Sequence, residues 1–226
     1  MPADPARAAA AHAAFVRAQT ALDAPPLVPE IRLHLATEVT PLWQATEATL
    51  QATGLAPPYW AFAWPGGQAL ARHLLDRPAL VAGRRVLDFA AGSGLAAIAA
   101  ARAGATSAEA AEIDPLACAA IALNAAANGV AVACGAEDLV GSPSRWDVVL
   151  AGDVCYERPM AGRVAAWLRQ LAGAGALVLM GDPGRTYLPA SGLAEQARYR
   201  VPTSRELEDR TERETVVWRV LPTESP

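Results

Sequence analysis

The chain has 226 residues, 53% of them hydrophobic, a composition that fits one α/β domain with a sizeable core and excludes a disordered chain. The formal net charge is −4 and there is no dense basic run, which argues against a nucleic-acid partner. The start of the chain lacks the charged-then-apolar pattern of a signal peptide, and no apolar run approaches the ~18 residues of a membrane span. Alanine-rich residues 6–22, with Arg7 and Arg17, could pass for a weak organelle transit peptide, but we expect a first helix packed on the domain instead. The cysteines and histidines lack metal-ligand spacing. We therefore expect a soluble, cytoplasmic monomer without a metal or a membrane partner.

The first 56 residues are expected to form a helical extension packed on the main domain. Alanine-rich residues 5–22 predict a helix, three prolines within 23–29 end it, and alternation over 31–36 predicts a short strand. A typical N-cap, Thr40, predicts a further helix over 40–53.

Residues 57–67 combine four aromatic side chains with three prolines and two glycines. This composition predicts a shaped surface rather than a regular element, followed by a helix over 68–75. From residue 84 onward, strand and helix patterns alternate. The expected strands are 84–88, 107–112, 130–134, 146–151, 176–181, 198–201 and 214–221, and the expected helices are 95–103, 115–128 and 159–172.

Alternation of this kind is typical of a parallel sheet with right-handed crossovers and helices on both faces. The last strand pattern, over 214–221, is expected to run antiparallel to its neighbours. We therefore predict a Rossmann-like α/β fold with a seven-stranded, mostly parallel sheet.

The first strand of this pattern ends in a glycine turn that opens a helix. Residues 86–94 read Val-Leu-Asp-Phe-Ala-Ala-Gly-Ser-Gly, and a helix N-terminus lets a ligand approach backbone N–H groups. The dinucleotide pattern G-x-G-x-x-G is incomplete, because Ala90 takes its first glycine position and Leu95 follows Gly94. Asp88 would repel a pyrophosphate but attract a cation. The motif therefore favours S-adenosylmethionine, with its ammonium and sulfonium, over a nicotinamide dinucleotide.

Acidic residues also follow the second and third strands. Glu112 stands eighteen residues after Gly94, near the spacing at which such folds place the acid that binds the ribose hydroxyls. Asp114 is expected to cap the next helix. After the third strand, either Glu137 or Asp138 would accept the adenine amino group, with Asp138 slightly favoured.

Asp153 and Tyr156 follow the fourth strand, where ligands of a parallel sheet bind close to the switch in strand order. Methyl transfer to an amine requires its neutral form, and desolvation beside a sulfonium lowers the amine pKa. Asp153 would then accept an N–H and orient the lone pair, with Tyr156 on the opposite side, so that positioning supplies most of the rate gain. The alternative interpretation is a capping aspartate and a packed tyrosine.

Residues 181–185, Gly-Asp-Pro-Gly-Arg, follow the fifth strand at the same edge of the sheet. Asp-Pro-Gly is typical of a turn. Asp182 and Arg185 would lie at the substrate mouth, where Arg185 could contact an acidic or carbonyl group of a partner.

Together these motifs resemble the seven-β-strand class I methyltransferases, and Asp153 to Tyr156 resembles the D-x-x-Y element of their protein-lysine branch. Within that branch the chain resembles the electron-transfer-flavoprotein β-subunit lysine methyltransferases. The matching segments are 35–44 (Leu-Ala-Thr-Glu-Val-Thr-Pro-Leu-Trp-Gln), 58–67 (Pro-Tyr-Trp-Ala-Phe-Ala-Trp-Pro-Gly-Gly), 150–156 (Leu-Ala-Gly-Asp-Val-Cys-Tyr) and 181–185. Ala90 and Glu112 depart from the usual glycine and aspartate of the family.

The resemblance implies a class I fold, S-adenosylmethionine as cofactor and a methyltransferase domain over residues 57–226. Trp64 would pack on the cofactor, and Asp153 and Tyr156 would form a lysine channel. The implied substrate is a lysine of a folded protein, namely the flavoprotein β-subunit and also, for bacterial relatives, a ribosomal protein.

Two other functions stay open at this point. One is a class I methyltransferase for another acceptor: a protein arginine, a protein N-terminus or a small-molecule amine. The other is a non-catalytic binding module of the same fold. The presence of Asp88, Glu112 and Asp153 together disfavours the binding module.

Overall fold

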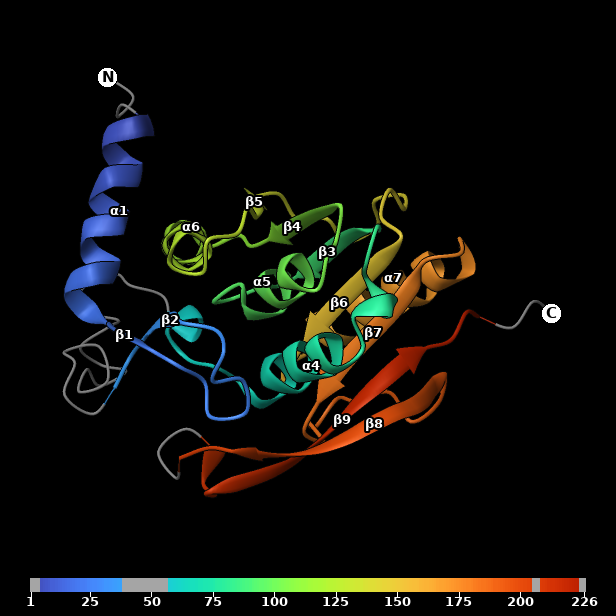
Figure 1. The fold of residues 1–226 in the computed structure, drawn as a ribbon. Coiled ribbons are helices and arrows are strands. Elements are labelled where there is room, and N and C mark those ends of the chain that lie inside the picture. Colours follow the sequence, from blue (N-terminus) through green and yellow to red (C-terminus); the bar gives the residue numbers. More distant parts are fainter. Residues whose placement is uncertain (1–4, 38–56, 205–207, 224–226) are drawn as a thin grey trace.

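A computed structural model of the protein describes residues 5–37, 57–204 and 208–223. Its main feature is a seven-stranded sheet with the order β5-β4-β3-β6-β7-β9-β8 (Figure 1). The strands are β3 (Arg85–Phe89), β4 (Ser107–Ala111), β5 (Ala133–Gly135), β6 (Val148–Gly152), β7 (Leu177–Asp182), β8 (Leu193–Pro202) and β9 (Glu212–Val220). Strands β3 to β7 pair in parallel, and β9 lies antiparallel between β7 and β8. The predicted fold, with its antiparallel last strand, is confirmed.

The helices cover both faces of this sheet. They are α1 (Pro5–Gln19), α4 (Pro65–Asp76), α5 (Leu95–Arg102), α6 (Pro115–Ala127) and α7 (Met160–Gly173), with short 3-10 turns η1 (Tyr59–Ala61) and η2 (Pro78–Leu80). Helices α4 and α5 lie on one face and α7 on the other (Figure 1). Among the described residues, none of these helices has the length and apolar character that crossing a membrane requires.

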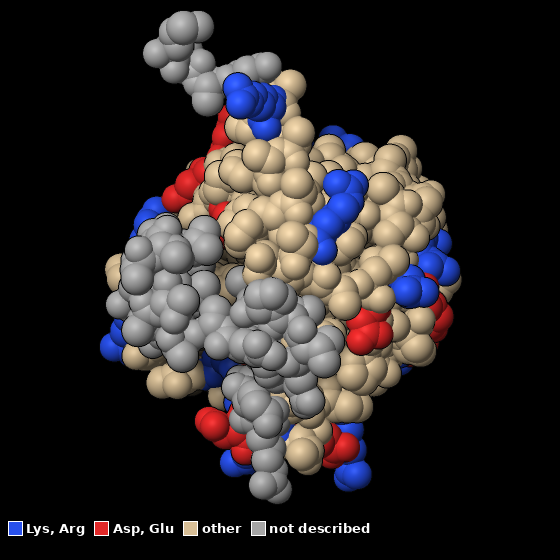
Figure 2. All heavy atoms as spheres, turned by 90° about the vertical axis from the view of Figure 1, so that its left-hand side faces the viewer, with Lys and Arg blue, Asp and Glu red and all other residues tan. Residues whose placement is uncertain are grey.

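Helix α1 packs on the edge of the main domain through its C-terminal half. Val16 is buried together with Trp60 of η1 and with Ala117 and Ala120 of α6. The described surface on this side is mostly uncharged, with arginine and acidic side chains scattered singly over it (Figure 2).

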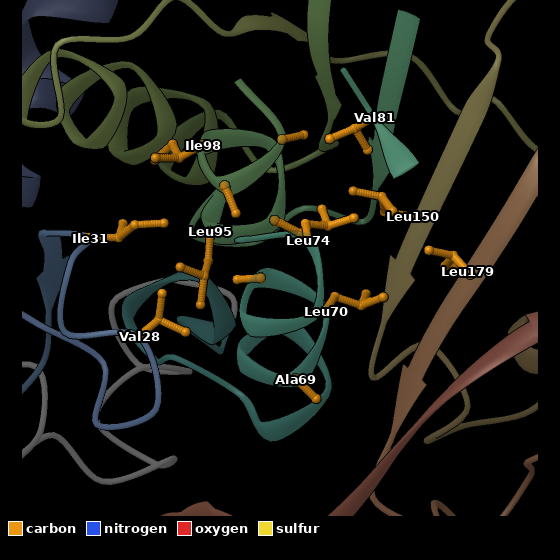
Figure 3. Packing of buried hydrophobic residues seen from close by; sticks show 14 of the residues in the cluster. Val28, Ile31, Ala69, Leu70, Leu74, Val81, Leu95, Ile98, Leu150 and Leu179 are labelled. Atoms are coloured by element: carbon orange, nitrogen blue, oxygen red, sulfur yellow. The ribbon is translucent and has the colours of Figure 1, made fainter. Parts of the chain in front are cut away.

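The pleat of the parallel strands sorts their side chains between two cores. In β6, Val148 and Leu150 pack towards α4 and α5, whereas Val149 and Ala151 pack towards α7. Figure 3 shows Leu150 in the first core, with side chains from α4, α5 and β7 around it. Strands buried on both faces read as continuous apolar runs, and full burial of one such side chain contributes about 1.5–3 kcal/mol.

Several element boundaries differ from the sequence predictions. The first helix ends at Gln19, and Ala21–Asp23 form β1, which pairs with β2 (Leu33–Leu35). This pairing overrides the helix propensity of the alanine-rich segment. Helix α4 begins at Pro65, three residues before the predicted start, because the two glycines in its first turn donate hydrogen bonds to Asp153. The helix expected over 40–53 lies outside the described residues.

Candidate active site

A cleft opens where β3 and β6 lie side by side at the centre of the sheet. The strand order reverses at this pair, the position at which open α/β sheets bind ligands beyond the carboxyl ends of their strands. The cleft holds about 410 Å³ of space between the protein atoms, a volume that includes open solvent. Five predicted site residues line it, Trp64, Asp88, Ala90, Gly92 and Asp153, together with Phe62, Gly67 and Ser93, which were not predicted.

Asp88 presents a buried carboxylate at the end of β3, with an exposed fraction of 3%. Its Oδ2 accepts a hydrogen bond from the N–H of Ala97 at 2.9 Å. Burial raises the pKa of Asp88 to about 8, against the lowering effect of this hydrogen bond, and the negative Glu112 adds to the rise. In the part of the chain that the structure describes, no basic side chain pairs with Asp88. The residues therefore fit a ligand that brings its own positive charge.

The glycine turn between β3 and α5 bends through left-handed backbone conformations. The φ angles of Ala90, Gly92 and Gly94 are 52°, 51° and 76°. A Cβ at Gly94 would lie 3.0 Å from Ile121 Cγ1, so both the conformation and the close helix contact require glycine there. Ala90 adopts a left-handed conformation that is uncommon for a residue with a side chain. The turn thus places the N-terminus of α5 beside the cleft.

Glu112 is tied to the glycine turn from the end of β4. Its Oε2 accepts from the N–H of Gly92 at 3.0 Å, and its Oε1 accepts from the N–H of Asp114 at 3.2 Å. Asp114 caps α6, since its Oδ1 accepts from the N–H of Leu116 at 2.8 Å, as predicted. Glu112 therefore lies at the edge of the same ligand-binding region.

Asp138 is not among the residues that line the cleft. Its side chain is 61% exposed, its Oδ1 accepts from the N–H of Val140, and its Oδ2 lies 3.8 Å from Arg163. Glu137 is exposed as well. The assignment of either residue to the adenine stays a prediction.

Asp153 links the cleft to the start of α4. It has a left-handed φ of 56° and an exposed fraction of 9%. Its Oδ2 accepts from the N–H groups of Gly66 and Gly67, at 2.7 and 3.2 Å. Burial raises the pKa of Asp153 to about 6, against the lowering effect of the positive Arg185. Asp153 therefore caps α4 and lines the cleft at the same time.

Arg185 lies between two buried carboxylates. Its Nη2 donates to Asp153 Oδ1 at 2.7 Å and to Glu208 Oε1 at 2.6 Å, and its Nη1 donates to Glu208 Oε2 at 3.2 Å. The side chain of Glu208 is 2% exposed, and Arg213 Nε lies 3.1 Å from its Oε2. Glu208 precedes β9, and the sequence analysis missed it because nothing nearby distinguishes it from the other acids of a charged segment.

Asp182 closes the turn after β7. Its Oδ1 accepts from the N–H groups of Gly184 and Arg185, both at 2.7 Å, which confirms the predicted turn. The residue is 1% exposed, and its Oδ2 is buried without a hydrogen-bond partner. Burial raises its pKa. Asp182 therefore supports the backbone of Arg185, and its contact with a substrate stays a prediction.

An aromatic group lies beside Asp153 and Arg185. The ring of Tyr59 is 6.1 Å from that of Trp64 and 5.8 Å from that of Tyr156. The guanidinium of Arg185 lies 5.6 Å from the Trp64 ring. Tyr156 is 44% exposed, and partial burial raises the pKa of its hydroxyl, which therefore stays protonated at neutral pH. The geometry brings Trp64, which was predicted to bind the cofactor, into one region with the predicted acceptor-side residues Asp153, Tyr156 and Arg185.

Within the described ranges, no group of three or more histidine, cysteine, aspartate or glutamate side chains is arranged to hold a metal ion.

A family model described as Ribosomal protein L11 methyltransferase matches residues 69–154. The solved L11 methylase of Lactobacillus delbrueckii subsp. bulgaricus is similar with a TM-score of 0.50 and 22% identity, over 71% of this chain and 81% of that one.

Magnesium protoporphyrin IX methyltransferase from Synechocystis, solved with bound SAM, is similar with a TM-score of 0.51 and 15% identity, over 82% of this chain and all of that one. These likenesses confirm the predicted fold.

Two curated relatives are each named electron transfer flavoprotein beta subunit lysine methyltransferase. The protein of Danio rerio is 37% identical over 85% of this chain and 76% of its own length. The protein of Xenopus laevis is 38% identical over 92% of this chain and 86% of its own length. With this identity over most of its length, the chain belongs to the electron transfer flavoprotein beta subunit lysine methyltransferase family, as its motifs predicted.

Proposed function

We propose that this enzyme methylates the ε-amino group of a lysine on a folded protein, and that this protein is the electron transfer flavoprotein β-subunit. The observation that carries the proposal is the cleft between β3 and β6, in which the buried carboxylates of Asp88 and Asp153 line one space. The names of the relatives point to the same acceptor.

The cofactor half of the site is formed by the glycine turn and its neighbours. S-adenosylmethionine, when bound, supplies a methyl group on a positively charged sulfur. Asp88 would hold the ammonium of the amino-acid end, and Glu112 would accept hydrogen bonds from the ribose hydroxyls. The buried, unpaired carboxylate of Asp88 supports the first assignment, and the position of Glu112 next to Gly92 supports the second.

The acceptor half surrounds Asp153. The rings of Tyr59 and Tyr156 would pack along the methylenes of a lysine, and their faces favour its cationic form on entry. Trp64, which lines the cleft, would pack on the cofactor. Desolvation between these rings lowers the amine pKa, so that the proton leaves to solvent before reaction. Asp153 would accept an N–H and aim the lone pair. Positioning then supplies most of the acceleration.

Glu208 is proposed as a positioning residue for this half. Its bidentate contact holds the guanidinium of Arg185 between Glu208 and Asp153. Arg185 therefore neutralises Asp153 only in part, and the carboxylate keeps negative charge for an incoming amine.

The ribosomal protein is a weaker candidate substrate. The family model named for L11 covers residues 69–154, and so ends before Tyr156, Arg185 and Glu208. The matches to the flavoprotein relatives cover 85% and 92% of the chain, which is too much to leave out Tyr156 and Arg185.

We also propose that the enzyme acts as a monomer in the cytoplasm and that it has no nucleic-acid partner. Residues 1–56 would form an extension packed on a methyltransferase domain over residues 57–226. The net charge of −4 and the sparse charges of the face in Figure 2 support the absence of a nucleic-acid partner. Light scattering coupled to gel filtration tests the oligomeric state.

The direct test is transfer of labelled methyl groups to purified electron transfer flavoprotein, followed by mapping of the methylated residue. Wild type is compared with Asp153→Asn and with Asp147→Asn, since Asp147 is a partly exposed acid that pairs with Arg85 beside the opposite end of β6, away from the cleft. We expect label on a β-subunit lysine with wild type and Asp147→Asn. We expect a loss of about 100-fold or more in kcat/KM with Asp153→Asn.

Affinity for S-adenosylhomocysteine is measured for all three proteins as a control, and we expect it to stay within a few fold. Normal affinity without label on the flavoprotein would refute the proposed substrate. Label on an arginine or on the protein N-terminus would favour another acceptor class. Full activity of Asp153→Asn would refute the role of Asp153.

A further inference from the structure

Two cysteines that the proposed mechanism does not use lie close together at the edge of the sheet. The Sγ atoms of Cys118 in α6 and Cys134 in β5 are 3.0 Å apart, and the thiol of Cys134 donates to Cys118. Cys118 in turn donates to the carbonyl oxygen of Glu112 at 3.2 Å. Cys134 is exposed and Cys118 is half-buried, so small reagents reach the pair.

The backbone holds both cysteines in place. Cys134 is paired with Ala110 of β4, and the N–H of Glu112 donates to the carbonyl of Gly135 at 3.0 Å. The N–H of Cys118 donates to the carbonyl of Asp114 in the first turn of α6. A disulfide is about 2.0 Å long, so the two sulfurs need to approach by only about 1 Å to form a bond.

The environment of the pair also favours reaction at Cys118. The hydrogen bond from Cys134 lowers the pKa of the Cys118 thiol, against the raising effects of burial and of the acids Glu112 and Asp114. The third cysteine, Cys155, differs: burial raises its pKa to about 12, and it lies in the core. Cys155 is therefore an unreactive reference within the same chain.

We propose that Cys118 and Cys134 are a redox-active dithiol that low-molecular-weight disulfides, such as glutathione disulfide, convert to an intramolecular disulfide, and that this closure weakens cofactor binding. The thiolate of Cys118 attacks one sulfur of the glutathione disulfide and releases one glutathione thiolate. Cys134 then loses its proton to solvent and attacks the Cys118 sulfur, which releases the second glutathione. The dithiol loses two electrons and the glutathione disulfide gains them.

The link to the cofactor runs through Glu112 and rests on the proposed function of that residue. Closure removes the thiol donor from the carbonyl oxygen of Glu112 and pulls α6 towards β5. The side chain of Glu112 accepts from Gly92 in the glycine turn, so a displaced Glu112 changes the ribose-binding end of the cleft.

The first experiment incubates the full chain with glutathione disulfide, blocks the remaining thiols and digests the chain with trypsin. No lysine or arginine lies between Arg102 and Arg145, so one peptide, 103–145, carries both cysteines. We expect this peptide to lose the mass of two hydrogens, while Cys155 is blocked as a free thiol after unfolding. Two free thiols in the peptide, or stable glutathione adducts, would refute the dithiol.

The second experiment measures the affinity for S-adenosylhomocysteine by calorimetry, with reduced and oxidised wild type and with Cys134→Ser treated in the same way. Oxidation is expected to weaken binding roughly tenfold in wild type, a size typical of a displaced positioning group, and to leave Cys134→Ser unchanged. Equal affinity of both wild-type forms would refute the coupling. Neither experiment uses a methyl acceptor, so a failure of the proposed substrate leaves both results interpretable.

Discussion

Two buried aspartates stand at neighbouring strand ends of the same cleft, yet they are neutralised in different ways. Asp88 ends β3 and Asp153 follows β6, and burial raises the pKa of both carboxyls. The pKa of Asp88 rises to about 8, whereas that of Asp153 rises only to about 6. The difference follows from Arg185, which lies 2.7 Å from Asp153.

The two aspartates differ in the source of the positive charge that pairs with each carboxylate. An ionised carboxylate is costly to bury without a partner. Asp153 receives its partner from the protein, through Arg185, whereas Asp88 receives its partner only from a cationic ligand. The cofactor half is thus incomplete until a ligand binds, and the acceptor half is assembled in advance. The predictions below test this division, from the largest expected effect to the smallest.

The largest effect is expected at Gly66, which anchors the preassembled half. A Cβ there would lie 2.2 Å from the carbonyl oxygen of Gly181 and 2.5 Å from Asp153 Oδ2, whereas a Cβ at Gly67 meets nothing within 4 Å. Gly66→Ala should lower the free energy of unfolding by about 3 kcal/mol or more and abolish activity. Gly67→Ala should change it by less than about 1 kcal/mol. Urea unfolding measures both, and equal stability of the two variants would contradict the assembled cap.

The next effect concerns the ligand-dependent half. Asp88→Asn should weaken S-adenosylhomocysteine binding by about 30-fold or more, because the ligand ammonium loses its buried partner. The free variant should keep its stability, since a buried ionisable group has been removed. Asp153→Asn is the matched control and should change this affinity by only a few fold. A larger loss with Asp153→Asn than with Asp88→Asn, measured by calorimetry, would reverse the comparison.

The smallest effect is expected from Glu208, whose negative charge raises the pKa of Asp153. In Glu208→Gln that charge is lost and Arg185 is left to Asp153 alone, so the pKa of Asp153 falls. The acid limb of kcat/KM should therefore move to lower pH by on the order of half a unit or more. Glu212→Gln, at an exposed position at the start of β9, should leave the limb in place. A uniform loss at every pH would indicate a purely structural role for Glu208.

The division between the cofactor half around Asp88 and the acceptor half around Asp153 also explains which parts of the site could be predicted from sequence. Asp88 and the glycine turn are contiguous, so the strand pattern and its turn residues placed them correctly. Asp153 was also placed, because parallel strands end at one edge of a sheet. Arg185 was placed at the same edge. The contact of Asp153 with Gly66 was not predicted, since Gly66 is 87 residues away, and neither was Glu208, which sits in a charged segment without a distinguishing pattern.

Asp138 shows what strand topology leaves open. Its side chain is largely exposed and accepts from the N–H of Val140 in its own turn, and its contact with the adenine stays a prediction. Strand topology locates the edge of a sheet, whereas the direction of a side chain after the strand depends on the local turn. For the same reason, the early start of α4 followed from a tertiary cap rather than from the helix sequence.

The measurement that tests the central claim most directly is proton release on S-adenosylhomocysteine binding, from calorimetry at pH 6.5 in two buffers of different ionisation enthalpy. With a pKa of about 8, Asp88 is protonated in the free protein at that pH, and a bound ammonium favours its ionised form. Wild type should release about one proton per ligand, and Asp88→Asn should release much less. Equal proton release by the two proteins would contradict the assignment of Asp88 as the carboxyl group that ionises when the ammonium of the ligand binds.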